Sequence, residues 1–408
     1  MDIPGLPARR AALKLLDAVL RRGETLDQAA HNAVQGIAAD ADRQLARAIA
    51  AEALRWLPDL DALIDSATRE PLPDDAKPRA VLRLMLAQWL RLGTPPHAVV
   101  ATALPLLMGG PKRLAHGVFA TLTRREASLP AHPSLPAAVA ARWGDRAGAI
   151  AAALALPPAL DLTLKDAGET AQWVERLGGL SLAPGHVRLP RGEAVERLPG
   201  FGEGAWWVQD LAASLPARLL GPGAGTALDL CAAPGGKALQ LAAAGWQVTA
   251  LDASAKRLER LRDNFARMAL PVEVVVADVQ DWEPQERFDA ILLDAPCTAT
   301  GTCRRHPDVL HRITPTHIRG MAELQQRLLA RTAGWLNPGG RLVYAVCSQE
   351  REEGEDIAAG VALTPLPIRA EELPAGLSPT PEGWLRTDPG MLPEAGGLDG
   401  FFIARWQA

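Results

Sequence analysis

Residues 226–237 constrain the fold more strongly than any other stretch of the chain. They read Thr-Ala-Leu-Asp-Leu-Cys-Ala-Ala-Pro-Gly-Gly-Lys. The apolar run 227–230 predicts a buried strand, Pro-Gly-Gly breaks it, and the Ala- and Leu-rich residues that follow favour a helix. A strand, a glycine turn and a helix in this order direct backbone N–H groups at a ligand. We therefore expect an α/β fold with a ligand site at the end of this strand.

The carboxylate of Asp252 narrows the class of ligand. It ends the next predicted strand, where it can accept hydrogen bonds from both hydroxyls of a ribose. The glycine turn lacks the G-x-G-x-x-G pattern of dinucleotide sites, and Lys237 is followed by Ala238 rather than by the Ser or Thr of a P-loop. With dinucleotide and P-loop sites excluded, the class of ligand that stays compatible with the sequence is a nucleoside with little or no phosphate.

The second half of the chain alternates strands and helices. Strands are predicted at 226–231, 247–252, 272–276, 290–294 and 341–346, and helices near 236–244, 254–268 and 318–335. This alternation predicts an α/β class of fold with a doubly wound, mostly parallel sheet that helices cover on both faces. Ligands of such sheets bind beyond the carboxyl ends of the strands.

The first part of the chain predicts only helices. Residues 7–127 carry apolar side chains at helical spacing. Thr25 and Gln28 form a capping-box pattern, and 77–90 is apolar enough for a central buried helix. A compact, all-α bundle is therefore expected.

Smaller elements are predicted between the bundle and the α/β region. A Pro-rich linker at 128–136 precedes an Ala-rich helical segment. Residues 160–164 alternate like a strand, and 170–177 favour a short helix. These features predict a small α+β region.

Charge and hydropathy indicate a cytoplasmic chain with no membrane segment. The net charge is −4, with 17 Lys and Arg against 14 Asp and Glu in the first 130 residues and 26 against 33 in the rest. This mild asymmetry fits either a local nucleic-acid surface or an ordinary solvated helical surface. The longest uncharged apolar stretch, 147–160, contains two prolines and is too short to span a bilayer. The N-terminus has no signal-peptide pattern.

The four cysteines are Cys231, Cys297, Cys303 and Cys347, and they include no C-x-x-C pair. We therefore expect neither a metal site nor a disulfide framework. A free cysteine is most often a small buried side chain, which is our interpretation for Cys303 and mainly for Cys231. Cys297 and Cys347 instead follow the ends of predicted strands, where ligands of parallel sheets bind.

The run Asp-Leu-Cys-Ala-Ala-Pro-Gly-Gly-Lys at 229–237 resembles the S-adenosylmethionine loop of the RNA cytosine-C5 methyltransferases of the Sun/Nol/Nop family. The resemblance extends over nearly the whole chain, and within the family it is to the bacterial enzymes that act on 16S rRNA. It implies a NusB-like helical RNA-binding domain at 1–130, a linker helix and small α+β region at 137–204, and a class I (Rossmann-like) methyltransferase domain at 205–408. From the residues alone, the first of these could also be a generic helical interaction module.

The resemblance implies S-adenosylmethionine as the cofactor. The loop amides would hold its carboxylate at a helix N-terminus, where the helix dipole favours an anion. Asp252 would bind the ribose, Asp278 would lie near the adenine amino group, and Asp294 would steady the target cytosine or the ammonium group of the cofactor. The full cofactor-binding set is Cys231, Ala232, Ala233, Pro234, Gly235, Gly236, Lys237, Asp252, Asp278 and Asp294.

The same resemblance implies the catalytic residues. C5 of cytosine is a poor nucleophile, and it becomes reactive when a thiolate adds to C6; a second reactive group then assists release. Cys347 would be the nucleophile and Cys297 the residue for product release, with Asp294 beside them. Neighbouring strands lie about 4.7–4.9 Å apart, so two cysteines that follow adjacent strands could face one base. DNA cytosine-C5 methyltransferases use the Pro-Cys position as the nucleophile, but the RNA-type context favours Cys347.

The run 298–308 resembles the family's stretch after the Pro-Cys pair. It implies that Arg304, Arg305 and His306 contact phosphates or bases of RNA. The chain also departs from the family pattern at four positions, which are Asp161 and Lys165 in the small region, Val346 in place of Thr, and Gly354 in place of Asn.

The sequence thus predicts an RNA methyltransferase that transfers a methyl group to C5 of a cytosine, with 16S rRNA as the favoured substrate and a covalent bond between Cys347 and C6. The target base would have to leave its stack to reach the thiols. Two alternatives stay open: a tRNA or another rRNA cytosine as the substrate, and a non-catalytic RNA-binding assembly factor. We expect RNA as the partner and a monomeric protein.

Overall fold

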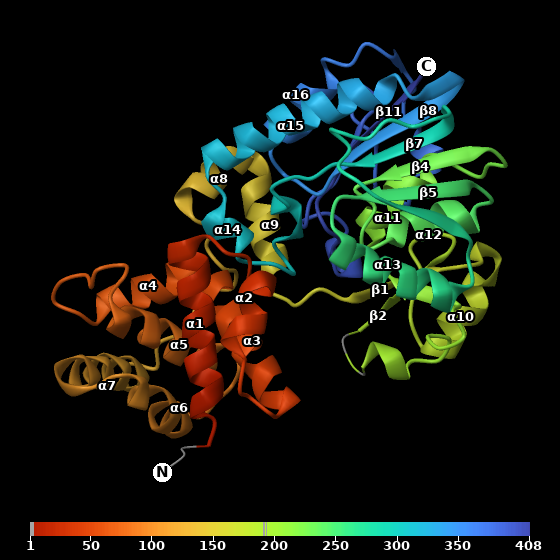
Figure 1. Cartoon of the computed structure of the whole chain (residues 1–408). Helices are drawn as coiled ribbons and strands as arrows, with labels where there is room; N and C mark the ends of the chain where they lie inside the picture. The colour runs from red at the N-terminus through yellow and green to blue at the C-terminus, as the bar shows by residue number, and fades with distance from the viewer. Residues whose placement is uncertain (1–3, 191, 193) are drawn as a thin grey trace. The chain divides into compact units, whose positions relative to one another are not determined.

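The computed structural model describes residues 4–190, 192 and 194–408, and these divide into two units. One unit extends to Leu156 and also contains Cys303–Ile313; the other consists of Pro157–Thr302 and Thr314–Ala408 (Figure 1). No helix in the described part of the chain is long and apolar enough to cross a membrane.

The first unit is a helical bundle. Its helices are α1 (Leu6–Arg22), α2 (Leu26–Ala33), α3 (Asp40–Arg55), α4 (Leu57–Ser66), α5 (Lys77–Leu90), α6 (Pro96–Ala103), α7 (Gly109–Arg124), α8 (Ala137–Trp143), α9 (Ala147–Leu154) and, much later in the chain, α14 (Val309–Arg312).

The local signals in this part of the sequence are confirmed. The predicted central helix is α5, whose apolar side chains from Val81 to Ala87 are fully buried because neighbouring helices cover it on several sides. At the start of α2, the Thr25 hydroxyl accepts a hydrogen bond from the Gln28 amide, and the Gln28 side chain accepts one from the Thr25 amide. This capping box satisfies two N–H groups that the helix itself leaves unpaired.

The segment Cys303–Ile313 completes the first unit, although it lies between strands of the second in the sequence. Nη1 of Arg55 donates to the carbonyl oxygen of Arg304 at 3.0 Å. Nε2 of His311 lies 2.7 Å from the carbonyl oxygen of Leu54. The helical domain expected at 1–130 therefore folds together with a segment from the second half of the chain.

The second unit begins with a small antiparallel sheet of order β2-β1-β3. Its elements are β1 (Leu160–Leu164), α10 (Thr170–Leu177), β2 (His186–Leu189) and β3 (Trp206–Val208). The predicted strand 160–164 and helix 170–177 are confirmed. Because α8 and α9 belong to the first unit, the region expected at 137–204 is divided between the two units.

A buried ion pair holds the small sheet in place. Asp161 departs from the family pattern, and both of its carboxylate oxygens accept hydrogen bonds from Arg188 at 2.7 Å. Arg188 also donates to the carbonyl oxygens of Ala395 and Gly397, both at 2.7 Å. Since Asp161 and Arg188 are 1% and 4% exposed, this pair connects the small sheet to a distant loop with little competition from water.

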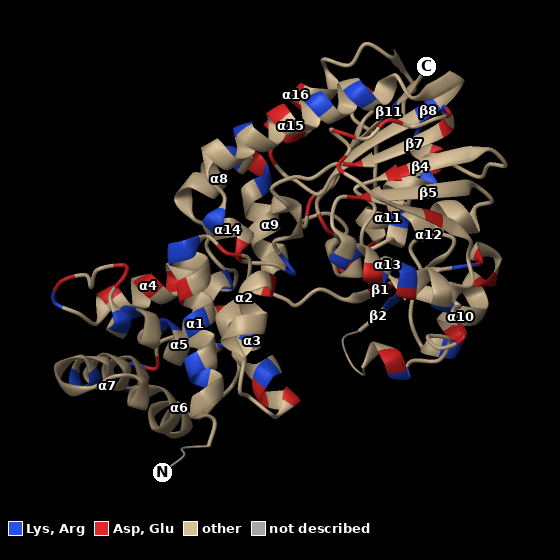
Figure 2. Ribbon diagram, in the orientation of Figure 1, with Lys and Arg blue, Asp and Glu red and all other residues tan. Residues whose placement is uncertain are grey.

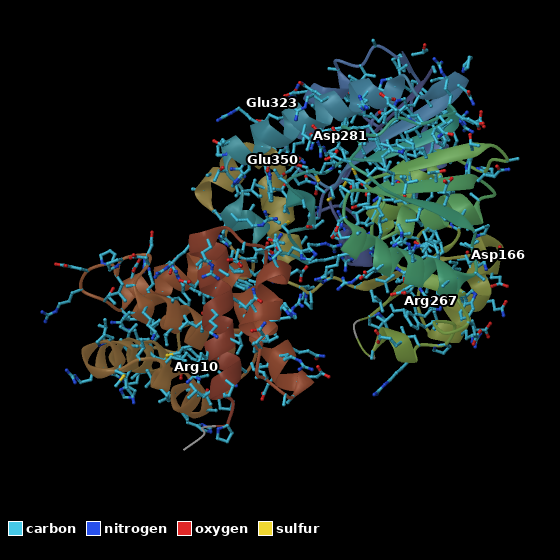
Figure 3. The ribbon with its side chains drawn as sticks, in the orientation of Figure 1. Arg10, Asp166, Arg267, Asp281, Glu323 and Glu350 are labelled. Atoms are coloured by element: carbon cyan, nitrogen blue, oxygen red, sulfur yellow. The ribbon has the colours of Figure 1, made fainter. Side chains whose placement is uncertain are left out.

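A second connection comes from α13 (Ala255–Met268). Arg267, labelled in Figure 3, donates from Nη1 to the carbonyl oxygens of Phe201 and Trp206 at 2.9 and 3.1 Å. The small sheet is therefore attached to the larger one by specific polar contacts as well as by apolar packing.

The main sheet has the order β10-β11-β8-β7-β4-β5-β6, and β9 pairs with β11. Its strands are β4 (Thr226–Leu230), β5 (Gln247–Asp252), β6 (Val272–Val276), β7 (Phe288–Asp294), β8 (Leu336–Val346), β9 (Thr364–Pro365), β10 (Leu385–Arg386) and β11 (Phe402–Gln407). The five predicted strands are confirmed as β4 to β8, which pair in parallel, whereas β11 runs antiparallel to β8.

Helices cover both faces of this sheet, as the alternating sequence predicts. Successive residues of β7 alternate between two cores: Ala290 and Leu292 join one, and Ile291 and Leu293 join the other. The first core includes α11 (Leu211–Arg218), α12 (Gly236–Ala243) and α13, and the second includes α15 (Pro315–Ala333) and α16 (Glu355–Ala358). Figure 2 shows that charged residues lie mainly on the helices and at the strand ends.

The buried ion pair generates a stability prediction. Replacement Arg188→Met should lower the free energy of unfolding of the second unit by about 3–5 kcal/mol, because it leaves the Asp161 carboxylate buried without its partner. Arg176→Met is the matched control: its ion pair with Glu203 is 42% and 63% exposed, so its loss should cost at most about 1 kcal/mol. Chemical denaturation followed by tryptophan fluorescence measures the free energy of unfolding of each variant. Equal losses in the two variants would contradict a structural role for the buried pair.

Candidate active site

The ends of four adjacent parallel strands converge on one edge of the main sheet. In the spatial order β8, β7, β4 and β5, these ends are followed or formed by Cys347, Asp294, Cys231 and Asp252. The register aligns Asp294 of β7 with Ala345 of β8, two residues before Cys347. Most of the residues singled out from the sequence therefore lie at a single edge.

The loop 231–235 follows β4 and leads into α12. Gly235 caps this helix with φ of 104°, a conformation that side chains rarely adopt, and a Cβ there would lie 3.0 Å from Leu261. The glycine thus allows the loop to turn tightly and leaves the amides at the start of α12 outside the intrahelical ladder.

The Asp252 carboxylate is fixed to this loop. One oxygen accepts from the amide of Ala233 at 3.2 Å, and the other accepts from the amide of Ser254 at 2.9 Å. Nη1 of Arg257 lies 3.4 Å away. Because Asp252 is only 3% exposed, its orientation is set by these contacts rather than by solvent.

Lys237 joins the glycine loop to the end of β7. Its Nζ lies 2.6 Å from an oxygen of Asp294 and 5.3 Å from the centre of the Phe401 ring. Burial alone would lower the pKa of Lys237, but the negative charge of Asp294 and the hydrogen bond that the ammonium donates to it more than offset this, and the pKa lies above its ordinary value. The ammonium group is therefore charged at neutral pH and lies within electrostatic range of Cys347.

Asp229 is a buried acid at the base of the same site. It is fully buried on β4, and Lys237 and the amide of Ala238 only partly offset the effect of that burial on its pKa. Burial, together with the negative charge of Asp294, raises the pKa of Asp229 well above the ordinary range of an aspartate. It is therefore protonated in the folded chain over a wide range of pH.

The two cysteines after β7 and β8 form a close pair. Their sulfur atoms are 3.5 Å apart, and both side chains are partly exposed. The interaction with Cys347, then burial, then the nearby charges raise the pKa of Cys297 well above that of a free thiol. Cys297 therefore keeps its proton more firmly than a free thiol does.

The loops that carry the thiols are bonded to each other. The amide of Gly301 donates to the carbonyl oxygen of Cys347 at 3.0 Å, and the amide of Gly400 donates to the carbonyl oxygen of Gly301 at 2.8 Å. A Cβ on Gly301 would lie 2.0 Å from the carbonyl oxygen of Gly400, so only glycine permits this close approach of the two loops. Three loops are thereby held in one arrangement around the sulfur atoms.

Glu353 is a polar residue of this site that the sequence interpretation noted only as the neighbour of Gly354. It is fully buried and accepts hydrogen bonds from the Thr298 amide and hydroxyl and from the Gln325 side chain. Burial raises the pKa of Glu353, although these donors oppose the shift. No local pattern marks such a residue, because its partners lie 28 and 55 positions away.

Three further residues that the sequence analysis discussed are Cys231, Asp278 and Cys303. Cys231 is in the glycine loop, where burial and the charge of Asp294 raise the pKa of its thiol, so it is not activated as a nucleophile. Asp278 is exposed after β6 and accepts a hydrogen bond from the Gln280 amide at 2.8 Å. Cys303 is fully buried in the helical unit.

The three predicted RNA contacts belong to the segment that completes the helical unit. Arg304 is only 2% exposed, so its side chain is not accessible to RNA in this conformation. Arg305 is partly exposed. The His306 side chain is 44% exposed, with Nδ1 3.6 Å from Asp27. The structure thus does not bring these residues together with the thiol pair in one unit.

The protonated state of Asp229 generates a pH prediction. Below about pH 4 the carboxyl is protonated in both the folded and the unfolded chain; above it only the unfolded chain ionises, so stability falls by about 1.4 kcal/mol per pH unit until the folded pKa is reached. Asp229→Asn should abolish this loss between pH 5 and 7 in chemical denaturation without added cofactor. Asp289→Asn is the control, because hydrogen bonds from Asn337 and Thr226 lower the pKa of Asp289 and leave no such slope in this range. A pH dependence that is the same in the Asp229 variant and the unmodified chain would contradict the assignment.

Comparison with known proteins agrees with this arrangement. The family profile described as 16S rRNA methyltransferase RsmB/F matches residues 218–407, and that of the NusB family matches residues 6–108. Ribosomal RNA small subunit methyltransferase B of Xanthomonas campestris pv. campestris is 36% identical over 86% of this chain and 86% of its own length. The protein of the same name from Xylella fastidiosa strain Temecula1 is 34% identical over 98% of each chain.

The fold is also found in a solved structure. The crystal structure of PH0851 superimposes with a TM-score of 0.73, at 22% identity over 100% of both chains, and this likeness concerns the fold alone. The first unit is thus a NusB-like helical domain, and the second contains a methyltransferase domain with a mostly parallel central sheet.

The residues at the strand ends fit the cofactor of such enzymes. A glycine turn with amides at a helix N-terminus suits a carboxylate, and a fixed carboxylate at the end of β5 suits ribose hydroxyls. The chain therefore belongs to the RsmB/F family of 16S rRNA methyltransferases and is an RNA methyltransferase with S-adenosylmethionine as its methyl donor.

Proposed function

We propose that this chain methylates C5 of a cytosine in RNA, with 16S rRNA as the substrate, through a transient covalent bond between Cys347 and C6 of the base. The observation that carries the proposal is the pair of thiols 3.5 Å apart at the ends of adjacent strands. The names of the relatives, which are small-subunit ribosomal RNA methyltransferases, support the choice of RNA.

A pair of thiols suits this chemistry because C5 of cytosine has too little electron density to attack a methyl group. When bound, S-adenosylmethionine supplies an electrophilic methyl group on a sulfonium. The thiolate of Cys347 adds to C6, and the electron pair of the C5–C6 double bond becomes available at C5. After methylation, a base must take the proton from C5; the C–H electron pair then restores the double bond, and the C6–S pair returns to Cys347.

The charges around the two sulfur atoms support different roles for them. The positive charge of the Lys237 ammonium lies within electrostatic range of the Cys347 sulfur. Glu353 instead contributes negative charge near Cys297 and helps to keep that thiol protonated. We therefore assign the nucleophile to Cys347 and product release to Cys297.

Formation of the adduct would also change Cys297. The contact with the Cys347 sulfur is the largest cause of its raised pKa. Once that sulfur is bonded to carbon, this contribution is lost, and the partly exposed Cys297 can give its proton to solvent more readily. It then becomes able to receive the C5 proton, so release would follow adduct formation rather than compete with it.

The other predicted residues keep their proposed roles around this pair. The loop 231–237 would hold the cofactor carboxylate, Asp252 the ribose and Asp278 the adenine, while Asp294, paired with Lys237, would steady the cytosine or the cofactor's ammonium group. In the helical unit, Arg305 and His306 retain exposed surface for RNA, whereas the buried Arg304 would need to move.

Substitution of the two cysteines tests the covalent mechanism. In purified protein with RNA and S-adenosylmethionine, Cys347→Ala should abolish both methylation and protein–RNA adducts, because no sulfur remains to attack C6. Cys297→Ala should form adducts that accumulate, because release loses its proton acceptor. Denaturing gel electrophoresis with labelled RNA measures the adducts of both variants. Cys303, which is buried in the helical unit, provides the control: Cys303→Ala should behave like the unmodified protein. Adducts that persist without Cys347 would reverse the assignment of the two thiols.

Deletion of the gene tests the substrate. Bisulfite sequencing of total rRNA and tRNA should reveal a 16S rRNA cytosine that loses its methyl mark in the deletion strain. A plasmid that carries the unmodified gene should restore the mark, and one that carries Cys347→Ala should not. Loss of a mark from tRNA or another rRNA would instead change the substrate, and unchanged RNA would favour a non-catalytic assembly factor.

A further inference from the structure

Glu353 is a fully buried carboxylate that contacts the loop of Cys297, and the mechanism above uses only its charge near that thiol. It ends the short 3-10 helix Arg351–Glu353, which begins four residues after Cys347. Both thiol-bearing segments therefore lie within its reach, one through the chain and one through hydrogen bonds.

The side chain of Glu353 holds the residue that follows Cys297. Its Oε2 accepts a hydrogen bond from the amide of Thr298 at 2.9 Å, and its Oε1 accepts one from the hydroxyl of the same residue. Two bonds from one carboxylate to one residue fix both the backbone and the side chain of Thr298. The Cα of Cys297 is thereby restrained from its C-terminal side.

The residue before Cys297 is held by a partner of the same carboxylate. Nε2 of Gln325, on α15, donates to the carbonyl oxygen of Pro296 at 2.9 Å and to Oε2 of Glu353 at 3.1 Å. Gln325 is itself fully buried, so these bonds are not exchanged with water. Cys297 is thus bracketed on both sides by one Glu–Gln pair.

The backbone of Glu353 is bonded to the strand of the other thiol. The Tyr344 hydroxyl, on β8 three residues before Cys347, donates to the carbonyl oxygen of Glu353 at 2.7 Å. Glu353 therefore connects β8, which precedes Cys347, to the loop after β7, which carries Cys297. This connection restrains the distance between the two sulfur atoms.

We propose that Glu353 is a positioning residue for product release, because it holds Cys297 at the place where that thiol can meet C5 of the adduct. This inference rests on the proposed function and adds to it the residue on which the geometry of release depends. Glu353 does not touch the base, and it should not affect the attack by Cys347. Loss of the Glu353 carboxylate should therefore slow the decay of the adduct and leave its formation unchanged.

The test compares Glu353→Gln with the unmodified protein and with Cys297→Ala. Gln has the same length, and its oxygen can take the place of Oε2, but its NH2 group then faces the Thr298 hydroxyl and cannot accept the hydrogen bond that this hydroxyl donates to Oε1. Single-turnover adduct formation should stay within about twofold, while decay of the adduct slows by roughly tenfold or more, so that labelled protein–RNA complex accumulates. Glu352→Gln, the exposed neighbour, should leave both rates unchanged.

A double variant separates positioning from a general loss of structure. If Glu353 acts through Cys297, then Cys297→Ala combined with Glu353→Gln should release product no more slowly than Cys297→Ala alone. If the double variant releases product more slowly than Cys297→Ala alone, by the factor that Glu353→Gln shows by itself, the inference is overturned. Equal slowing of adduct formation and adduct decay in Glu353→Gln would also overturn it. If Glu353→Gln does not fold, as judged by circular dichroism, Thr298→Val removes the bonds of this hydroxyl to Glu353 and to Ser348 but keeps the amide bond, and it must show the same selective slowing of decay.

The outcomes also distinguish this inference from the function on which it rests. If Cys297→Ala forms no adduct with RNA, the covalent mechanism fails and the role of Glu353 fails with it. If Cys297→Ala traps RNA but Glu353→Gln releases product at the normal rate, only the positioning role is overturned.

Discussion

Parallel pairing of β7 with β8 is the interaction on which the active-site geometry depends. The pairing aligns Asp294 with Ala345, and each strand is followed within three residues by a cysteine. Strands in a sheet lie about 4.7–4.9 Å apart, so the two loops leave the sheet close enough for the sulfur atoms to reach 3.5 Å. A change in register by one residue would turn these side chains to the opposite faces of the sheet.

The charges close to the two thiols differ, although the thiols are chemically identical. Lys237 reaches the end of β7 from the glycine loop and provides positive charge within range of Cys347, while Glu353 provides negative charge near Cys297. Both charges lie in a poorly hydrated region, where electrostatic effects are stronger than at the surface. The cofactor loop and the thiol pair are therefore one electrostatic system, joined by the Lys237–Asp294 ion pair.

In the sequence, the thiol loop is followed directly by the segment that belongs to the helical unit. The short 3-10 helix Thr300–Thr302 belongs to the methyltransferase unit, and the next residue, Cys303, is already buried in the helical one. Both units are thereby continuous with the loop that carries Cys297.

Local pattern was sufficient for the elements but not for the contacts between them. The sequence by itself determined the alternating α/β region, the helical bundle, the glycine loop and the two strand-end cysteines, because periodicity and turn chemistry act over a few residues. Only the tertiary structure decided that Cys303–Ile313 folds with the helical unit, that Asp161 pairs with Arg188, and that Glu353 brackets Cys297 together with Gln325. Each of these depends on burial of a polar group against a partner tens to hundreds of residues away, and the need for that partner leaves no trace in the residues on either side.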